Sequence, residues 1–320
     1  MKNNNPLVSI IVCTKSRIGT LKAALESIFN QSVQNFEVIV VLSSRSEDNS
    51  NDFLVDMKGK DMIRLVINDG NRINARNLGI SLAKGQFICF VDDDDIILRN
   101  KIEVQANYLI NHEDVDVVSC TTMIDAGSAI ANTLVEHFPL DIVKILESGE
   151  DVDTVINFQS CMFRKRVFDN FYKDKQPFDN LFIAGGEGQF LIYDMIINHG
   201  VHFANTPNTI YVYHVGAAPN SLSGNVDPVF YNTHLYGKSW DEKREFVKNF
   251  QVLFGDKEEK IEEKTVEEPT KKPRKPRAKK EKPSEESTEK PKRGRKKKVE
   301  QPAEIPTEKP KRGRKKKTND

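Results

Sequence analysis

The sequence lacks long hydrophobic runs and has only four cysteines. No apolar run approaches the ~20 residues that a membrane-spanning helix needs, and the amino-terminal run Leu7–Cys13 has no small-residue cleavage site after it, so no signal peptide is predicted. The cysteines lie far apart in apolar segments, which excludes a close metal-ligand pair and favours buried, reduced thiols; they are Cys13, Cys89, Cys120 and Cys161. We therefore expect a soluble, intracellular, cytoplasmic protein without a membrane span.

Aromatic residues are absent from residues 256–320. This segment holds 8 of the 14 prolines and has 25 Lys plus Arg against 15 Asp plus Glu, a net charge of +10. Because the whole chain has 48 basic and 47 acidic residues, residues 1–255 have 23 and 32, a net charge of −9. A segment with so few apolar side chains cannot offset the entropy of ordering. We predict an acidic folded domain over residues 1–255 and a disordered, basic, proline-rich tail over residues 256–320.

Strands and helices alternate in the first part of the folded domain, which predicts a parallel sheet with right-handed crossovers. The predicted strands are Leu7–Cys13, Phe36–Leu42, Ile63–Ile67, Phe87–Val91 and Val115–Thr121. The predicted helices cover about Thr20–Gln31, Asn51–Met57, a segment through Ala75, Leu78, Leu82 and Ala83, and Lys101–Asn111. Gly85 is suited to ending the third helix in the left-handed conformation.

The pattern is looser further along the chain. Strands are predicted over Ile130–Phe138 and Asn157–Phe163, with one or two more in Val201–Val215. Helices are predicted over about Leu140–Ser148, opened by Pro139, and over Gln189–His199 and Trp240–Phe254. The expected fold class is α/β, with a mostly parallel central sheet flanked by helices.

Four consecutive carboxylates, Asp92–Asp95, follow the apolar strand Phe87–Val91. Adjacent like charges are costly unless a cation or a polar ligand meets them. In open α/β sheets, ligands bind just outside the carboxyl ends of the strands, where these acids are expected. A binding site is one interpretation, and an acidic, solvated turn is the other.

Four segments together resemble the family 2-like glycosyltransferases of the GT-A (Rossmann-like) fold. They are VSIIVCTKSR at Val8–Arg17, INARNLGISLAKG at Ile73–Gly85, FVDDDDI at Phe90–Ile96 and GGEGQFL at Gly185–Leu191. The resemblance covers roughly Pro6–Val215. It implies a nucleotide-sugar-binding half over residues 1–122 and an acceptor-side half over residues 123–255.

The resemblance also implies a divalent metal ion, Mn²⁺ or Mg²⁺, which would neutralise the departing nucleoside diphosphate. Asp94 is the expected direct ligand, and Asp92 is expected to contact ribose or metal-bound water. His214 is expected near the metal and the donor phosphates, although a structural histidine is the alternative. The other expected nucleotide-sugar contacts are Thr14, Arg17, Ser43, Arg76, Asn77 and Asp93, and for Arg76 a salt bridge to the acids is a competing interpretation.

Two departures from the family pattern affect the expected chemistry. Where the family often has a Glu-Asp pair whose second acid is the catalytic base, this chain has Glu187-Gly188. Glu187 is then the candidate base, with Asp194 as an alternative, and Asp95 would orient the metal ligands or touch the acceptor; a helix-start role for Glu187 and a catalytically weak site also stay open. Where the family reads the base with an Asp after the second strand, this chain has Leu42-Ser43-Ser44-Arg45, which points to Ser43, with Asp48 as a weaker substitute.

A basic unit, Glu-Lys-Pro-Lys-Arg-Gly-Arg-Lys-Lys-Lys, occurs twice in the tail. Its Arg-Gly-Arg cores resemble the AT-hook that binds A·T-rich minor grooves; they are Arg293-Gly294-Arg295 and Arg312-Gly313-Arg314. Each unit would neutralise several phosphates and give salt-dependent binding to DNA or another polyanion. A solubilising tail or a localisation signal is the alternative.

The resulting hypothesis is a metal-dependent, inverting glycosyltransferase that transfers a hexose or pentose from a nucleotide-sugar to an acceptor hydroxyl. A hydroxylated base in DNA is the sharpest candidate acceptor, with the tail as a tether. The alternative is a non-catalytic protein with a nucleotide-sugar fold, whose basic tail binds nucleic acid.

Overall fold

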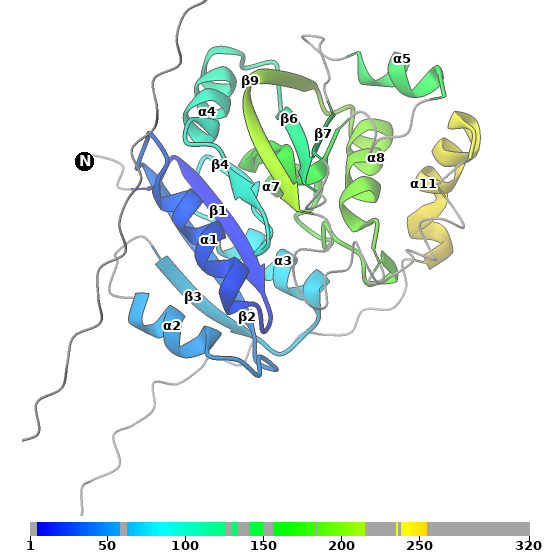
Figure 1. Cartoon of the computed structure of the whole chain (residues 1–320). Helices are drawn as coiled ribbons and strands as arrows, with labels where there is room; N and C mark the ends of the chain where they lie inside the picture. Colours follow the sequence, from blue (N-terminus) through cyan, green and yellow to red (C-terminus); the bar gives the residue numbers. More distant parts are fainter. Residues whose placement is uncertain are drawn as a thin grey trace, which may run out of the picture. The chain divides into compact units, whose positions relative to one another are not determined.

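The computed structural model describes residues 5–57, 63–125, 130–133, 141–149, 156–182, 185–214, 235 and 238–254. Within these residues one sheet runs through the domain, and helices cover both of its faces (Figure 1). The strand order is β3-β2-β1-β4-β8-β6-β9-β5, and β7 pairs with β6 at the side of this path.

The first half of the sheet is parallel, as the alternation of strands and helices predicts. It consists of β1 (Val8–Thr14), β2 (Phe36–Ser43), β3 (Ile63–Asn68) and β4 (Phe87–Phe90). The helices between them are α1 (Ile18–Phe29), α2 (Ser50–Met57) and α3 (Arg72–Leu82). Because all four strands point the same way, the residues that follow β1, β2 and β4 meet at one edge of the sheet.

The second half of the sheet is mixed. Strand β8 (Met162–Arg164) is antiparallel to both β4 and β6 (Val117–Asp125), and β9 (Phe203–His214) is parallel to β6. Two short strands, β5 (Ile96–Ile97) and β7 (Ile130–Thr133), add antiparallel edges. The long β9 therefore returns the chain to the end of the acidic loop that follows β4.

The remaining helices of the described chain are α4 (Lys101–Asn111), α5 (Ile142–Glu147), α7 (Lys165–Phe171), α8 (Glu187–His199) and α11 (Trp240–Phe254), with 3₁₀ turns at Phe158–Ser160 and Asn180–Phe182. Two separate apolar clusters fill the two faces of the sheet. Ile10 and Val12 of β1 lie in the cluster with α1, α2 and α4, while Ile11 lies in the cluster with α3, α8 and α11. This alternation is the period-2 pattern of a strand that is buried on both sides.

Most predicted elements lie within one or two residues of their expected bounds, and Lys101–Asn111 and Trp240–Phe254 match fully. The predicted strand Asn157–Phe163 is wrong in its first part: Asn157 caps a 3₁₀ turn, and the strand begins at Met162. The helix expected from Leu140 begins at Ile142, with Asp141 as its N-cap. Helix α7, which directly follows β8, was not predicted.

Gly85 corrects another expectation. The left-handed glycines of the described chain are Gly149, Gly185, Gly186 and Gly200, and Gly85 is not one of them. A Cβ atom on Gly85 would come within 2.5 Å of the Ser9 backbone nitrogen. The glycine is therefore needed for the close approach of this turn to β1, not for a helix end.

In the described part of the chain, no helix is long and apolar enough to cross a membrane. All four cysteines are unpaired, and Cys89, Cys120 and Cys161 are buried. Burial raises the pKa of the Cys89 thiol to about 11, which disfavours its thiolate form. The prediction of buried thiols is confirmed for these three cysteines, whereas Cys13 is only partly buried.

Candidate active site

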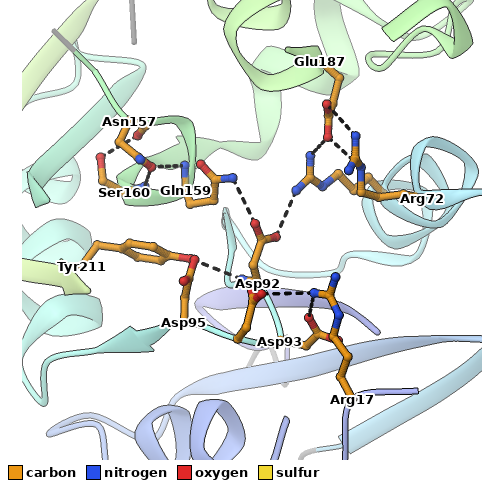
Figure 2. Close-up of polar contacts among 12 residues, drawn as sticks. Arg17, Arg72, Asp92, Asp93, Asp95, Asn157, Gln159, Ser160, Glu187 and Tyr211 are labelled. Atoms are coloured by element: carbon orange, nitrogen blue, oxygen red, sulfur yellow. Dashed lines mark hydrogen bonds and ion pairs between the residues drawn. The ribbon is translucent and has the colours of Figure 1, made fainter. Parts of the chain in front are cut away.

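The acidic loop Asp92–Asp95 begins directly after β4, at the carboxyl edge of the parallel strands. Helix α3 approaches the same edge with its first turns, because Asn71 caps it through a reciprocal bond pair with Asn74. The cap fixes the start of α3, from which Arg72 points to Glu187 (Figure 2) and Arg76, one turn further on, donates to Asp92.

Arg76 joins the acidic loop to helix α8. Its guanidinium donates to Asp92 at 3.0 Å and also forms a short ion pair with Glu187. Arg76 is 4% exposed, and although burial alone would lower its pKa, Glu187 and Asp92 together raise it. The competing prediction of a salt bridge between Arg76 and the acids describes this geometry.

Glu187 has a second arginine partner. The Nε atom of Arg72 lies 2.9 Å from Glu187 Oε1, and an Nη atom of Arg72 lies 3.0 Å from Glu187 Oε2. Glu187 is the first residue of α8 and follows the left-handed Gly185 and Gly186, so the chain turns sharply here and presents the carboxylate to α3. Glu187 Oε1 has two arginine partners and Oε2 has one, so Oε2 has the capacity to accept one more hydrogen bond or a proton.

Gln159 is a site residue that the sequence analysis missed. Its side-chain amide donates to Asp92 Oδ2 at 3.0 Å, so both carboxylate oxygens of Asp92 have a donor (Figure 2). Asn157 holds this 3₁₀ turn by accepting from the backbone N–H groups of Gln159 and Ser160. Burial favours the protonated form of Asp92, but Arg76 and Gln159 outweigh it and hold its pKa below the usual range.

Arg17 reaches the acidic loop from the start of α1. One Nη atom lies 2.8 Å from Asp93 Oδ1 and 3.2 Å from Asp94 Oδ2. Burial raises the pKa of Asp93 to about 6, and Arg17 partly counters this effect. Burial and the neighbouring Asp92 also raise the pKa of Asp94.

Asp95 is fully buried and anchors strand β9. It accepts from the Tyr211 hydroxyl at 2.6 Å and from the His214 backbone N–H at 2.8 Å. Burial and the nearby Asp92 charge raise the pKa of Asp95 well above its usual value. These contacts make Asp95 a support for the loop and for His214, whose Nε2 lies 3.5 Å from Asp125.

Asp194 and Asn77 contact groups outside the acidic loop. Asp194 accepts from the Tyr172 hydroxyl at 2.6 Å and lies 3.5 Å from His199 Nε2. The Asn77 side chain donates to the backbone carbonyl of Phe178 at 2.8 Å and accepts from its backbone N–H at 3.0 Å. Their predicted catalytic and donor-binding roles remain predictions.

The two loops expected to bind the nucleotide are fastened to each other. The Ser16 backbone N–H donates to the Ser46 hydroxyl at 2.8 Å, and the Ser16 hydroxyl accepts from Glu47 at the same distance. Asp48 accepts from the first backbone N–H of α1, at Ile18, also at 2.8 Å. Ser43 ends β2 beside these loops, and Thr14 ends β1. Asp48 therefore has a structural contact at the start of α1. The nucleotide-binding roles of Ser43 and Thr14 remain predictions.

The donor chemistry around the acidic loop fits a hard divalent cation. Asp92, Asp93, Asp94 and Glu187 pair with Arg17, Arg72 and Arg76, which leaves an excess of one negative charge. The buried Asp93 Oδ2 and His214 Nδ1 have no hydrogen-bond partner among the described residues. The same residues contain no group of three or more His, Cys, Asp or Glu side chains arranged as a complete metal site. Mg²⁺ and Mn²⁺ commonly take one or two carboxylates and complete their shell with water and substrate phosphates, so the residues fit the ion.

The predicted nucleic-acid-binding residues in the tail, Arg293, Gly294, Arg295, Arg312, Gly313 and Arg314, lie outside the described residues.

Comparison with known proteins gives the class. Residues 9–172 match the family described as glycosyl transferase family 2, and the chain belongs to this family of glycosyltransferases. An uncharacterised glycosyltransferase of Methanocaldococcus jannaschii is 25% identical over 252 residues, covering 77% of this chain and 83% of that protein. The glycosyltransferase GlyG of Streptococcus pneumoniae is 36% identical over 115 residues, which span 35% of this chain and 38% of GlyG.

Solved structures with the same fold confirm the predicted GT-A architecture. The Staphylococcus aureus protein TarS, in a structure of residues 1–349 with UDP-GlcNAc, has a TM-score of 0.59 at 17% identity, covering 77% of this chain and 73% of that chain. The mannosyltransferase PcManGT from Pyrobaculum calidifontis, in complex with GDP-Man and Mn²⁺, has a TM-score of 0.50 at 17% identity, covering 78% and 70%.

Proposed function

We propose that this glycosyltransferase transfers a hexose or pentose from a nucleotide-sugar to an acceptor hydroxyl with inversion, in a metal-dependent reaction at the acidic loop Asp92–Asp95. The observation that carries the proposal is the meeting of this loop, at the carboxyl edge of the parallel strands, with three arginines and Glu187 in one network. Ligands of open α/β sheets bind at this edge. The fold neighbours TarS, with UDP-GlcNAc, and PcManGT, with GDP-Man and Mn²⁺, support a nucleotide-sugar as the donor.

Arg17 and Arg76 are the proposed contacts to the donor diphosphate. Both are buried or nearly so, and each already faces a carboxylate of the loop. Positive groups held in a poorly hydrated site stabilise the negative charge that develops on the leaving diphosphate. Asp94, with Asp92 and His214 nearby, would hold the divalent ion, which supplies further positive charge at the same leaving group.

Glu187 is the proposed base for the acceptor hydroxyl. It starts α8, on the opposite side of Arg76 from Asp92, so a substrate bound between the two halves would lie beside it. Arg72 and Arg76 orient its two oxygens. Oε2, which has a single arginine contact, would take the acceptor proton.

A thermal-shift screen of nucleotide-sugars with and without Mn²⁺ tests this function, because a ligand that binds the native state raises the melting temperature with its occupancy. We expect one nucleotide-sugar to stabilise the chain in a Mn²⁺-dependent manner and to be hydrolysed or transferred slowly. Asp94→Asn should abolish the Mn²⁺ dependence, while the exposed substitution Asp56→Asn should leave it intact. The absence of any metal-dependent stabilisation or turnover across the panel would support the non-catalytic alternative.

We further propose that the basic tail tethers the enzyme to a polyanion and that this polyanion is the acceptor, with a hydroxylated base in DNA as the sharpest case. Residues 1–255 have a net charge of −9 and residues 256–320 a net charge of +10. An acidic domain alone would be repelled by DNA. A flexible cationic tether would offset this repulsion and raise the local acceptor concentration.

A further inference from the structure

A cavity of about 530 Å³ opens at the amino edge of the sheet, opposite to the acidic loop. Its wall is made by the residues just before β1, β2 and β4 and by the junction of β8 and α7. Gln86 in this wall and Asp92 lie six residues apart along the extended chain of β4 and Val91, which corresponds to ~20 Å. The cavity is therefore separate from the candidate active site. Its volume lies in the range of small-molecule sites, roughly 300–1,000 Å³.

The charge of the cavity is opposite to that of the domain. Four basic residues line it, Lys84, Arg164, Lys165 and Arg166, against one acid, Asp169. Three amide side chains, Asn5, Asn35 and Gln86, add neutral hydrogen-bonding groups. Residues 1–255 as a whole have a net charge of −9, so the positive charge of the cavity is not a general property of the domain.

Two of the four cations are balanced by carboxylates. Lys165 pairs with Asp169 one turn along α7, and Arg166 pairs with Asp116 at 2.9 Å. Asp169 in the wall and Asp116 behind it are thus already paired. Lys84 and Arg164 are the two basic residues of the wall that remain to be considered.

Arg164 is 6% exposed and is held by carbonyl oxygens, not by a carboxylate. It donates to Val115 O at 2.7 Å and to His112 O at 3.0 Å, beyond the end of α4. The carbonyl end of α4 positions this guanidinium and partly compensates its charge, and the acids Asp116, Glu113 and Asp114 also act on it. For the exposed ammonium group of Lys84, no carboxylate partner lies among the described residues. The wall itself therefore has an excess of positive charge, with four basic side chains against Asp169.

We propose that this cavity binds a dianionic phosphate group. The excess of positive charge in the wall suits a phosphomonoester or one end of a diphosphate, and the amide N–H groups of the wall can donate to its oxygen acceptors. Lys84 supplies an exposed ammonium group, and Arg164 adds a fixed positive charge in the wall.

Site-resolved acetylation of the full chain tests the proposal. Lysine labelling is followed by mass spectrometry in EDTA at constant ionic strength, with inorganic phosphate, inorganic pyrophosphate or a sugar monophosphate added. We expect saturable protection of Lys84 and Lys165, and none of Lys22, which is exposed on α1. Tighter protection by the sugar phosphate would identify a phosphate carried on a larger molecule, and tighter protection by pyrophosphate would identify the free anion; both outcomes support the phosphate site.

Calorimetric titration with the best of these ligands provides the second measurement. Lys84→Glu should weaken binding about tenfold or more, since a charged contact is lost and a repulsive one added. Lys22→Glu, an equal change of charge elsewhere, should have no effect, and the basic tail is the same in both variants. Protection that does not saturate, protection that chloride reproduces, or equal affinities of the two variants would overturn the proposal.

Discussion

Phe158 lies so close to Gly188 that a Cβ atom on this glycine would come within 2.7 Å of the ring carbon Cγ. The ring is buried and packs against Phe90 and Phe178, with centroids 5.0 and 5.5 Å away. The position where related enzymes often have the second acid of a Glu-Asp pair is thus filled by an aromatic core. An acid at residue 188 would have to displace Phe158, and the absence of that acid is built into the packing of this chain.

Gly188→Ala should therefore destabilise the protein by about 1–3 kcal/mol, the usual cost of overpacking a core. Gly19→Ala is the matched control, because Gly19 is also helical and its Cβ would meet nothing within 4 Å. Urea unfolding of both variants measures the difference. A Gly188→Ala variant as stable as Gly19→Ala would mean that Phe158 moves without cost, and the packing argument would fail.

A second prediction concerns pH. The pKa of Asp93 in the folded chain is raised to about 6, and that of an aspartate in an unfolded chain is about 3.9. Between about pH 4 and pH 6 the folded state then binds more protons at Asp93 than the unfolded state, so this residue makes the free energy of unfolding fall as the pH rises. Asp93→Asn removes this contribution.

We expect the stability of Asp93→Asn relative to the parent to increase from about pH 4 to pH 7 and to level off above that. Urea unfolding in EDTA at several pH values gives the two curves. Asp56→Asn, an exposed change on α2, should run parallel to the parent. A parallel curve for Asp93→Asn would show that burial does not shift the titration of this carboxyl.

Local patterns were enough to predict where the acidic loop lies in the fold. The apolar strand Phe87–Val91 followed by four acids predicts both a buried central strand and the position of Asp92–Asp95, because both features follow from adjacent residues in the sequence. Helix α3 is predicted from the apolar spacing of Ala75, Leu78 and Leu82, whereas the choice of Arg76 as a site residue comes from the family resemblance. The elements that the sequence misplaced lie where no regular period exists, as in the 3₁₀ turn at Phe158–Ser160.

Contacts over long sequence distances could not be predicted in this way. Gln159 lies 67 residues beyond Asp92 in the sequence, and no motif around Gln159 indicates that its side chain contacts the acidic loop. Likewise, Gly188 looks like the loss of an acid until Phe158 is seen beside it. Both relationships depend on how β8 brings the second half of the chain against β4.

Arg17 gives a third prediction. Its guanidinium lies 2.8 Å from Asp93 and 3.2 Å from Asp94, so its positive charge repels a metal ion that binds to these carboxylates. At an effective dielectric constant of about 20, two unit charges 4 Å apart interact by ~4 kcal/mol, so we expect Arg17→Ala to tighten Mn²⁺ binding by about tenfold or more. Electron paramagnetic resonance of free Mn²⁺ measures this affinity. Arg99→Ala, an exposed change beyond the acidic loop, should leave it unaltered, and weaker binding by Arg17→Ala would contradict the competition.

The tail gives a fourth prediction. A chain without residues 256–320 should bind duplex DNA more weakly and with a flatter dependence on salt, because each phosphate neutralised contributes a slope of about −0.9 to the logarithmic plot. Fluorescence anisotropy at several salt concentrations measures both quantities. A full-length chain with Gln in place of the Lys and Arg of residues 290–298 and 309–317 separates charge from length. Unchanged affinity and slope after truncation would remove the tail from DNA binding.

Glu187 gives the last prediction. If it takes the acceptor proton, Glu187→Gln should lower kcat by about 10²–10⁴, whereas Glu26→Gln, an exposed change on α1, should have no effect. Because Arg72 and Arg76 both contact Glu187, a loss of activity could also arise from misplaced arginines. The pH profile distinguishes the two: removal of a base abolishes the acidic limb of kcat, while misplacement of the arginines keeps the limb and raises the KM for the donor.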